Sequence, residues 1–108
     1  MKRLIATVLA LSALSANAEF KSGNKLYEEL NGSTMNQMYA LGYIVGVADA
    51  LAGIAICMPD NVTAGQINDM VKNYLAAVPA DRNHTADRIV FKVLRDVWPC
   101  KNKTGTGI

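Results

Sequence analysis

The stretch from Met38 to Cys57, MYALGYIVGVADALAGIAIC, decides the fold of this chain. Sixteen of its 20 residues are apolar, the exceptions being three glycines and Asp49. A run of this length forms either a transmembrane helix or the central helix of a bundle. Much of its apolar content is alanine, and a central aspartate costs about 2.5–3.5 kcal/mol in a bilayer. The stretch therefore favours a bundle helix covered on several sides by its neighbours, with membrane insertion as the weaker alternative.

Small residues recur along one side of this helix, at Gly42, Gly46, Ala50 and Gly53, so that another helix can approach closely. Asp49 lies beside them, and a buried carboxylate must be paired. We expect Asp49 to accept a hydrogen bond from a helix N-terminus or a tyrosine hydroxyl inside the bundle. A ligand or catalytic role is the alternative, although no second carboxylate or base occurs near it in sequence.

Helix signals flank this stretch on its N-terminal side. Asn24 is expected to cap a short first helix that Asn31-Gly32 ends. Thr34 and Gln37 have the spacing of a capping box, which predicts that the long helix begins there and runs to about Ile56.

Two amphipathic helices are predicted after the long one. Thr63 and Gln66 form a second capping box, followed by apolar residues at offsets of 0, 3, 4, 7, 8 and 11 from Ile67 until Pro79. A similar pattern runs from Ala86 to Val97 and stops before Pro99. The prediction is an all-α, single-domain bundle of three main helices and one short one, over residues 19–100, with a flexible tail at 101–108.

The N-terminus has the pattern of a secretory signal peptide, over residues 1–18, with cleavage after Ala18. Removing Lys2 and Arg3 leaves 9 of the 11 basic residues against 9 acidic ones. A formally neutral domain of this size gives no basic face for nucleic acid and no room for a multidomain enzyme. We expect export to an oxidising compartment.

The two cysteines, Cys57 and Cys100, are expected to form one disulfide in such a compartment. The bridge would close a 44-residue loop (57 through 100) and stabilise the fold by about 4 kcal/mol on the chain-entropy model. A zinc site needs four ligands, and the chain has only these cysteines and His84 to offer. A Cys–His nucleophile is the remaining alternative, although an oxidising compartment would consume the thiol.

Several motifs together resemble the Rap/Tai family of type VI secretion immunity proteins. They are Gly23-Asn24-x-Leu26, Gly42-Tyr43-Ile44-x-Gly46-Val47-x-Asp49, Cys57-x-Pro59-x-x-Val62-Thr63-x-x-Gln66, Tyr74-Leu75 and Trp98-Pro99-Cys100. The resemblance covers nearly the whole chain after the signal peptide. Many members have a second cysteine pair, where this chain has Leu30 and Met38-Tyr39.

The resemblance implies a small periplasmic helical protein, without cofactor or metal, that neutralises a peptidoglycan amidase effector. Such a protein, in homodimeric form, would bind its effector and block the active site with a loop. The expected contact loops contain Met58, Asp60 and Asn61, and Asp81, Arg82, Asn83 and His84. The expected structural residues are Gly42, Tyr43, Gly46, Asp49, Pro59, Thr63 and Pro99.

Each contact loop also has a simpler interpretation. Asn61 and Asn83 are residues that cap helices, Asp81-Arg82 fits a solvated turn, and His84 fits the first turn of the last helix. The alternative function is a periplasmic acid-stress chaperone, because 9 acidic groups are neutralised in acid while 9 basic ones remain. An inner-membrane peptide and an enzyme rank lower, and no pair of groups has catalytic spacing.

Overall fold

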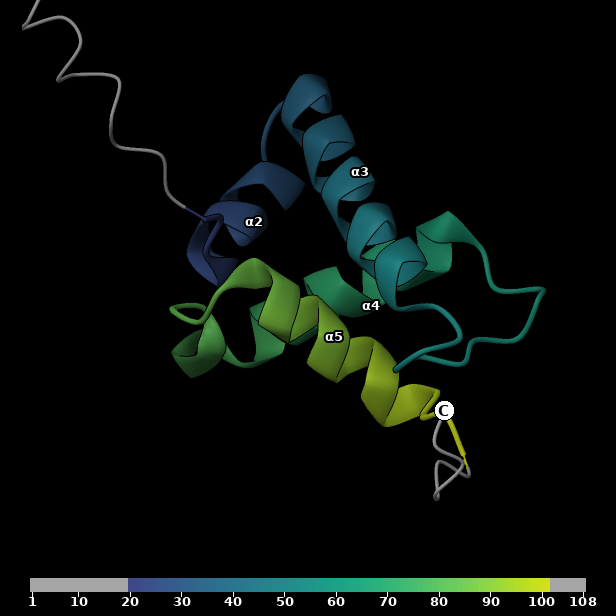
Figure 1. The fold of residues 1–108 in the computed structure, drawn as a ribbon. Coiled ribbons are helices and arrows are strands. Elements are labelled where there is room, and N and C mark those ends of the chain that lie inside the picture. The colour runs from purple at the N-terminus through teal and green to yellow at the C-terminus, as the bar shows by residue number, and fades with distance from the viewer. Residues whose placement is uncertain (1–19, 102–108) are drawn as a thin grey trace, which may run out of the picture.

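The computed structural model describes residues 20–101, and this part of the chain folds into four α-helices (Figure 1). They are α2 (Gly23–Leu30), α3 (Thr34–Leu51), α4 (Ala64–Ala77) and α5 (Ala86–Val97), with a short 3-10 helix, η1 (Pro79–Asp81), after α4. The predicted all-α class with three main helices and a short one is confirmed. The predicted signal peptide and the predicted tail beyond residue 101 lie outside the described residues.

Two helices begin with a different cap from the predicted one. Ser22, not Asn24, caps α2, and its Oγ accepts a hydrogen bond from the Lys25 backbone N–H at 3.1 Å. Ser33, not Thr34, caps α3 in the same way. In both segments two capping side chains lie one or two positions apart, so local preference alone does not choose between them.

The predicted capping box of α4 is confirmed. The Thr63 hydroxyl accepts from the Gln66 backbone N–H at 3.1 Å, and the Gln66 side chain accepts from the Thr63 N–H at 2.8 Å. This reciprocal pair satisfies two backbone donors that a helix start leaves without partners. It therefore fixes the point where the preceding loop enters α4.

α3 ends at Leu51, five residues before the predicted end. Ala52 is extended, and Gly53 has a φ of +79°, which only glycine adopts without strain. The Ile54 N–H donates to the Leu51 carbonyl at 3.0 Å, which completes a type II turn. Within residues 20–101 no helix combines the length and the apolar character needed to cross a membrane.

The core lies where α3, α4 and α5 meet, with α2 packed at one end (Figure 1). Each helix contributes residues at helical spacing from its apolar side, as the pattern predicts for α4 and α5. The largest fully buried side chains are those of Leu26, Ile44, Ile56, Val71, Leu75, Val90 and Leu94.

The prediction that α3 is covered on several sides is wrong. Its neighbours bury only the side that contains Ala40, Ile44 and Ala48. On the opposite side a Cβ placed on Gly42 or Gly46 would meet nothing within 4 Å. A domain this small has too few helices to surround its longest one, so that side faces outward. We call this surface the open stripe of α3, formed by Met35, Met38, Tyr39, Gly42, Gly46 and Asp49.

The expectation of a buried, paired Asp49 is also wrong. Its side chain is exposed on the open stripe, and no polar or charged residue within 20–101 is buried. An exposed carboxylate keeps its hydration and needs no partner inside the protein. The charge in the middle of this apolar helix therefore marks its outward side.

The predicted disulfide between Cys57 and Cys100 is confirmed, with the two Cα atoms 4.9 Å apart. It joins the segment after α3 to the segment after α5. Beside it the Cys57 N–H donates to the Trp98 carbonyl at 2.9 Å, and Ile56 forms an isolated bridge with Pro99. The covalent and hydrogen-bonded contacts together hold the two segments side by side.

Candidate partner-binding site

The first predicted contact loop, residues 58–61, is fixed at both ends and extends away from the helices (Figure 1). The disulfide at Cys57 anchors its start, and the capping box at Thr63 anchors its end. Asp60 and Asn61 at its tip are exposed, whereas Met58 is half-buried against the core. The polar tip is therefore presented on a short and well-anchored loop.

The tip itself contains a turn. The Val62 N–H donates to the Pro59 carbonyl at 3.3 Å, and the ring of Pro59 restricts the backbone at the first position of that turn. Asn61 does not cap a helix, because the cap of α4 is Thr63. Its side chain therefore does not have the capping role that the sequence also allowed.

Arg82, in the second predicted loop, is a structural residue. Its Nε donates to the Leu75 carbonyl at 2.7 Å, in the last turn of α4. Its guanidinium group lies over the ring of Tyr27 in α2, 4.0 Å from the centroid. A cation at a helix C-terminus satisfies a carbonyl there and interacts favourably with the helix dipole. Arg82 therefore joins α2 to α4.

The backbone around Arg82 is bound to the start of α2. The Asn24 N–H donates to the Arg82 carbonyl at 2.6 Å, and the Gly23 N–H donates to the His84 carbonyl at 2.8 Å. Asn83 is exposed and caps no helix, because Thr85 is the cap of α5. His84 lies before that cap, so its predicted place in the first helical turn is wrong.

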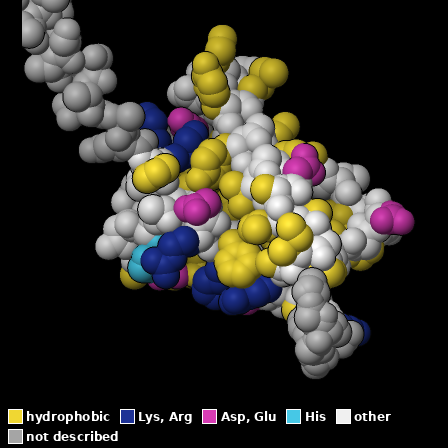
Figure 2. All heavy atoms as spheres, in the orientation of Figure 1, with side chains coloured by type: hydrophobic (Ala, Val, Ile, Leu, Met, Phe, Trp, Pro, Cys, Tyr) yellow, Lys and Arg dark blue, Asp and Glu magenta, His cyan; other side chains and the backbone are white. Residues whose placement is uncertain are grey.

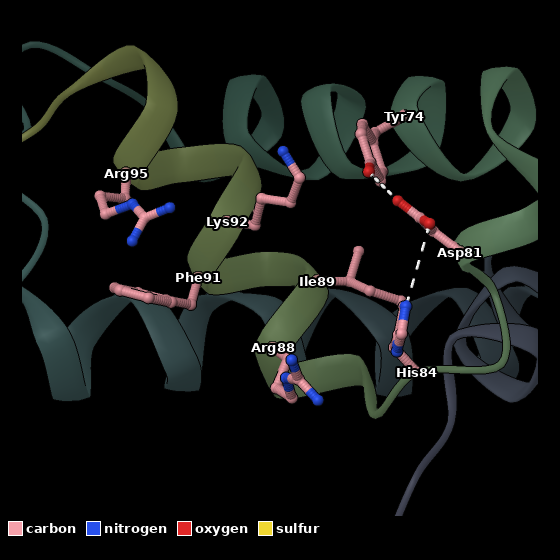
Figure 3. Close-up of a pocket in the computed structure, with 8 residues that line it drawn as sticks. All are labelled: Tyr74, Asp81, His84, Arg88, Ile89, Phe91, Lys92 and Arg95. Carbon is pink, nitrogen blue, oxygen red and sulfur yellow. Dashed lines mark hydrogen bonds and ion pairs between the residues drawn. The ribbon is translucent and has the colours of Figure 1, made fainter.

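Asp81 connects α4 to His84 through its two carboxylate oxygens (Figure 3). The Tyr74 hydroxyl donates to one oxygen, and His84 Nε2 lies 3.9 Å from the other. The hydrogen bond to Asp81 is the main reason that the pKa of Tyr74 is raised, with burial adding to it. Asp81 is therefore occupied by contacts inside the protein.

The two predicted loops lie apart. They flank opposite ends of α4, whose 14 residues give a length of about 21 Å. A single narrow cleft on a partner cannot receive both loops of one molecule. Of the two, only residues 58–61 have exposed polar side chains on a segment that projects from the bundle.

A third surface, which the sequence analysis did not identify, lies along α5. Arg88, Lys92 and Arg95 follow one another at helical spacing on its exposed side, around the ring of Phe91 (Figure 3). Arg95 lies over that ring at 4.7 Å from the centroid. Their spacing of four and three residues in the sequence indicates that they share one face of the helix. That pattern alone does not predict a binding surface, because exposed basic residues on an amphipathic helix are common.

Asp96 pairs with two of these cations. It accepts a hydrogen bond from Lys92 at 2.9 Å and lies 3.5 Å from Arg95. The hydrogen bond from Lys92 is the main cause of the lowered pKa of Asp96, and the same bond raises the pKa of Lys92. Among residues 20–101 no carboxylate pairs with Arg88.

The motif residues are distributed over the fold. Gly42, Gly46 and Asp49 lie on the open stripe, Tyr43 is half-buried beside it, and Pro59 and Pro99 flank the disulfide. Burial is the main cause of the raised pKa of Tyr43, and the charge of Asp87 adds to it. In the described part of the chain, no group of three or more His, Cys, Asp or Glu side chains lies close enough to hold a metal ion.

These features define a small helical protein with one disulfide, a projecting loop and two exposed helix surfaces, all suited to contact with another protein. The chain belongs to the Rap1a immunity proteins, because the model of that family matches residues 22–100. No curated protein matches the chain. The family match supports the role of an immunity protein in type VI secretion, and favours it over the acid-stress chaperone.

No disulfide holds α2, because the two cysteines of the chain, Cys57 and Cys100, bind each other. The family resemblance implies a second cysteine pair at the positions of Leu30 and Met38-Tyr39, but here Leu30 is buried in the core, whereas Met38 and Tyr39 are exposed. The backbone bonds of Gly23 and Asn24 and the packing of Arg82 on Tyr27 attach the helix instead.

Proposed function

We propose that this protein is a periplasmic inhibitor that binds a peptidoglycan amidase effector and blocks its active site without catalysing a reaction. The family supplies the immunity role. The observation that supports occlusion is the projecting loop 58–61, with its exposed tip residues between a disulfide and a capping box. A loop held at both ends loses little conformational entropy when it enters a cleft, so more of the contact energy remains as affinity.

The loop tip is expected to provide part of the binding energy. Replacing Asp60 and Asn61 together by alanine should weaken binding to the cognate amidase effector by at least tenfold, because two polar contacts in the cleft are lost. Both side chains are exposed, so the melting temperature should not change. Titration calorimetry with the purified effector measures the affinity.

Asn83→Ala is the matched control, since Asn83 is also an exposed asparagine but lies at the other end of α4. It should bind like the wild type. Equal affinities for the wild type, the loop variant and Asn83→Ala would contradict the assignment of the loop.

Coexpression in the periplasm tests the function as a whole, because continued lysis by the effector in the presence of abundant inhibitor would rule out immunity.

We also propose that the protein is a homodimer in which the open stripe of α3 packs against its copy. Met35, Met38 and Tyr39 on this stripe each expose about two thirds of their surface (66%, 68% and 65%). The absence of side chains at Gly42 and Gly46 leaves room for a second helix at short distance. Large exposed apolar side chains clustered at one end of a helix, such as Met35, Met38 and Tyr39, are typical of a surface that another protein covers.

Light scattering after gel filtration tests this arrangement. The wild type is expected at twice the mass of one mature chain. Gly46→Glu should give a monomer, because it places a carboxylate near Asp49 in the contact while α3 itself has space for the side chain. Gly65→Glu, in the first turn of α4, is the control and should stay dimeric. A wild type that is monomeric at all concentrations would contradict the proposal.

The proposed compartment follows from the signal peptide pattern of residues 1–18 together with the disulfide. Mass spectrometry of the protein recovered by osmotic shock should give a chain that begins at Glu19. Recovery of the full-length chain from the cytoplasm would contradict export.

A further inference from the structure

The face between α3 and α5 combines an apolar hollow with unpaired positive charge. The hollow has a volume of about 410 Å³ and is lined mainly by side chains of Val47, Ala50, Leu51, Ala55 and Phe91. Arg88 and Asp87 lie at its edge. Figure 2 shows this face with apolar side chains at its centre and basic ones below and beside them.

A second hollow of about 440 Å³ adjoins the first along α5. Tyr74, Asp81, His84 and Ile89 line it together with the three basic residues of α5 (Figure 3). Arg88 and Phe91 belong to both hollows and therefore form the ridge between them. A ligand bound in the apolar hollow would therefore lie next to Arg88, and a longer ligand would extend along α5 to Lys92 and Arg95.

The charges on this face are not equivalent. Asp96 pairs with Lys92 and Arg95, and Tyr74 donates to Asp81, so these groups have partners within the protein. Arg88 has no carboxylate partner in residues 20–101. Its guanidinium group can donate two parallel hydrogen bonds to a carboxylate, which gives both affinity and orientation. Asp87 also lines the apolar hollow, but it forms no ion pair with Arg88. Its charge instead acts on the Tyr43 hydroxyl, whose pKa is raised mainly by burial and further by Asp87. Within the described residues, Arg88 is thus a hydrogen-bond donor without an anionic partner.

From this combination we infer that the α3–α5 face binds a segment of the effector in which an apolar side chain is flanked by Asp or Glu. The apolar side chain fills the hollow beside Phe91, and the carboxylate pairs with Arg88. Arginine and aromatic residues around a desolvated pocket are the groups that contribute most to protein interfaces. The inference rests on the proposed function, and adds to it the chemistry of a second contact region.

This face adjoins the proposed dimer contact and extends beyond it. Val47 and Leu51 lie on α3 about 100° and 140° around the helix axis from Gly46, at 100° per residue, whereas Ala50 lies about 40° from Gly46 and borders the open stripe. Arg88 and Phe91 belong to α5, so a second copy on the open stripe leaves that side of the hollow free for the effector. The dimer and the effector contact can therefore be tested with different substitutions.

Charge reversal at Arg88 tests the inference. Arg88→Glu should weaken binding of the purified amidase effector at least tenfold, whereas Arg88→Lys, which keeps the charge but not the paired donors, should lose less. Raising the salt concentration should slow association of the wild type more than that of Arg88→Glu. Lys25→Glu, an exposed charge reversal on α2, is the control and should bind like the wild type.

Ala55→Trp tests the apolar part, since Ala55 lies after the end of α3 and outside the open stripe, and a large side chain there fills the hollow and should also weaken binding. Melting temperatures and light scattering accompany each variant, because a loss that follows unfolding or a change in oligomeric state would overturn the inference. Tight binding by the wild type with no effect of Arg88→Glu would overturn this inference and leave the proposed function intact. A wild type that does not bind the effector would overturn both.

Discussion

Replacing Cys57 and Cys100 together by serine is expected to lower the free energy of unfolding by about 4 kcal/mol. The bridge spans 43 residues of sequence separation, and without it the unfolded chain gains the entropy of an open loop. Domains of this size are stable by only about 5–10 kcal/mol, so the loss is a large part of the total. The melting temperature should fall by roughly 20 °C.

Thermal unfolding followed by circular dichroism at 222 nm measures this change. The wild type with a reducing agent should melt close to the double variant, because both lack the same bridge. Cys57→Ser alone should also match them, since one cysteine cannot form the intramolecular bond. A double variant that melts within a few degrees of the oxidised wild type would contradict the expected contribution.

The bridge should also matter for binding. It fixes the start of the proposed contact loop, and its loss releases Cys57 from the segment beside Trp98. At a temperature where the variant is still folded, we expect weaker binding to the effector. Thermal unfolding thus measures the global stability of the domain, whereas binding below the melting temperature measures the order of its loop.

The second large effect is expected at Gly23. A Cβ at this position would lie 2.4 Å from the Ile89 side chain and 2.7 Å from the Arg82 carbonyl oxygen. The backbone cannot move aside easily, because neighbouring hydrogen bonds tie the start of α2 to Arg82 and His84. Gly23→Ala should therefore reduce stability by about 1–3 kcal/mol, the usual cost of overpacking.

Gly65→Ala is the matched control for this prediction. A Cβ there would meet only the Thr63 hydroxyl, at an ordinary contact distance of 3.9 Å. Because alanine favours the helix more than glycine does, this substitution should raise stability by up to about 1 kcal/mol. Urea denaturation of the two variants should shift the midpoint in opposite directions. If both midpoints shift equally, the close contact with Ile89 and Arg82 does not explain why glycine occupies position 23.

Most of the secondary structure was predictable from the sequence. The Thr63–Gln66 capping box and the pairing of Cys57 with Cys100 were predicted and are confirmed. The predicted apolar faces of α4 and α5 are also confirmed, except at Val97 in the last turn of α5, which is 53% exposed. These features depend on periodicity, on a local hydrogen-bond pattern or on the number of cysteines. The caps of α2 and α3 were not predicted, because each segment offers two competing polar residues.

The candidate site was predictable only in part. The sequence indicated two polar loops, but it did not show how far apart they lie in the folded protein. In the structure, the length of α4 separates them. From the sequence, Arg82 is expected to be a residue of an exposed turn. In the structure its side chain donates a hydrogen bond to the Leu75 carbonyl and packs on the ring of Tyr27. Arg88 and Phe91 of α5 line a hollow together with residues of α3. That arrangement also depends on how these two helices, which are distant in sequence, pack together.

The sequence alone determined that this protein is a small helical bundle with one disulfide, because helical periodicity, caps and cysteine number are local or countable properties. Its motifs also determined the family, which the match over residues 22–100 confirms. Only the tertiary structure decided which side of α3 is covered. The periodicity of an almost uniformly apolar helix does not distinguish its faces. In the part of the chain that the structure describes, three neighbouring helices pack on α3 and bury one of those faces. The exposed glycines and Asp49 follow from that packing.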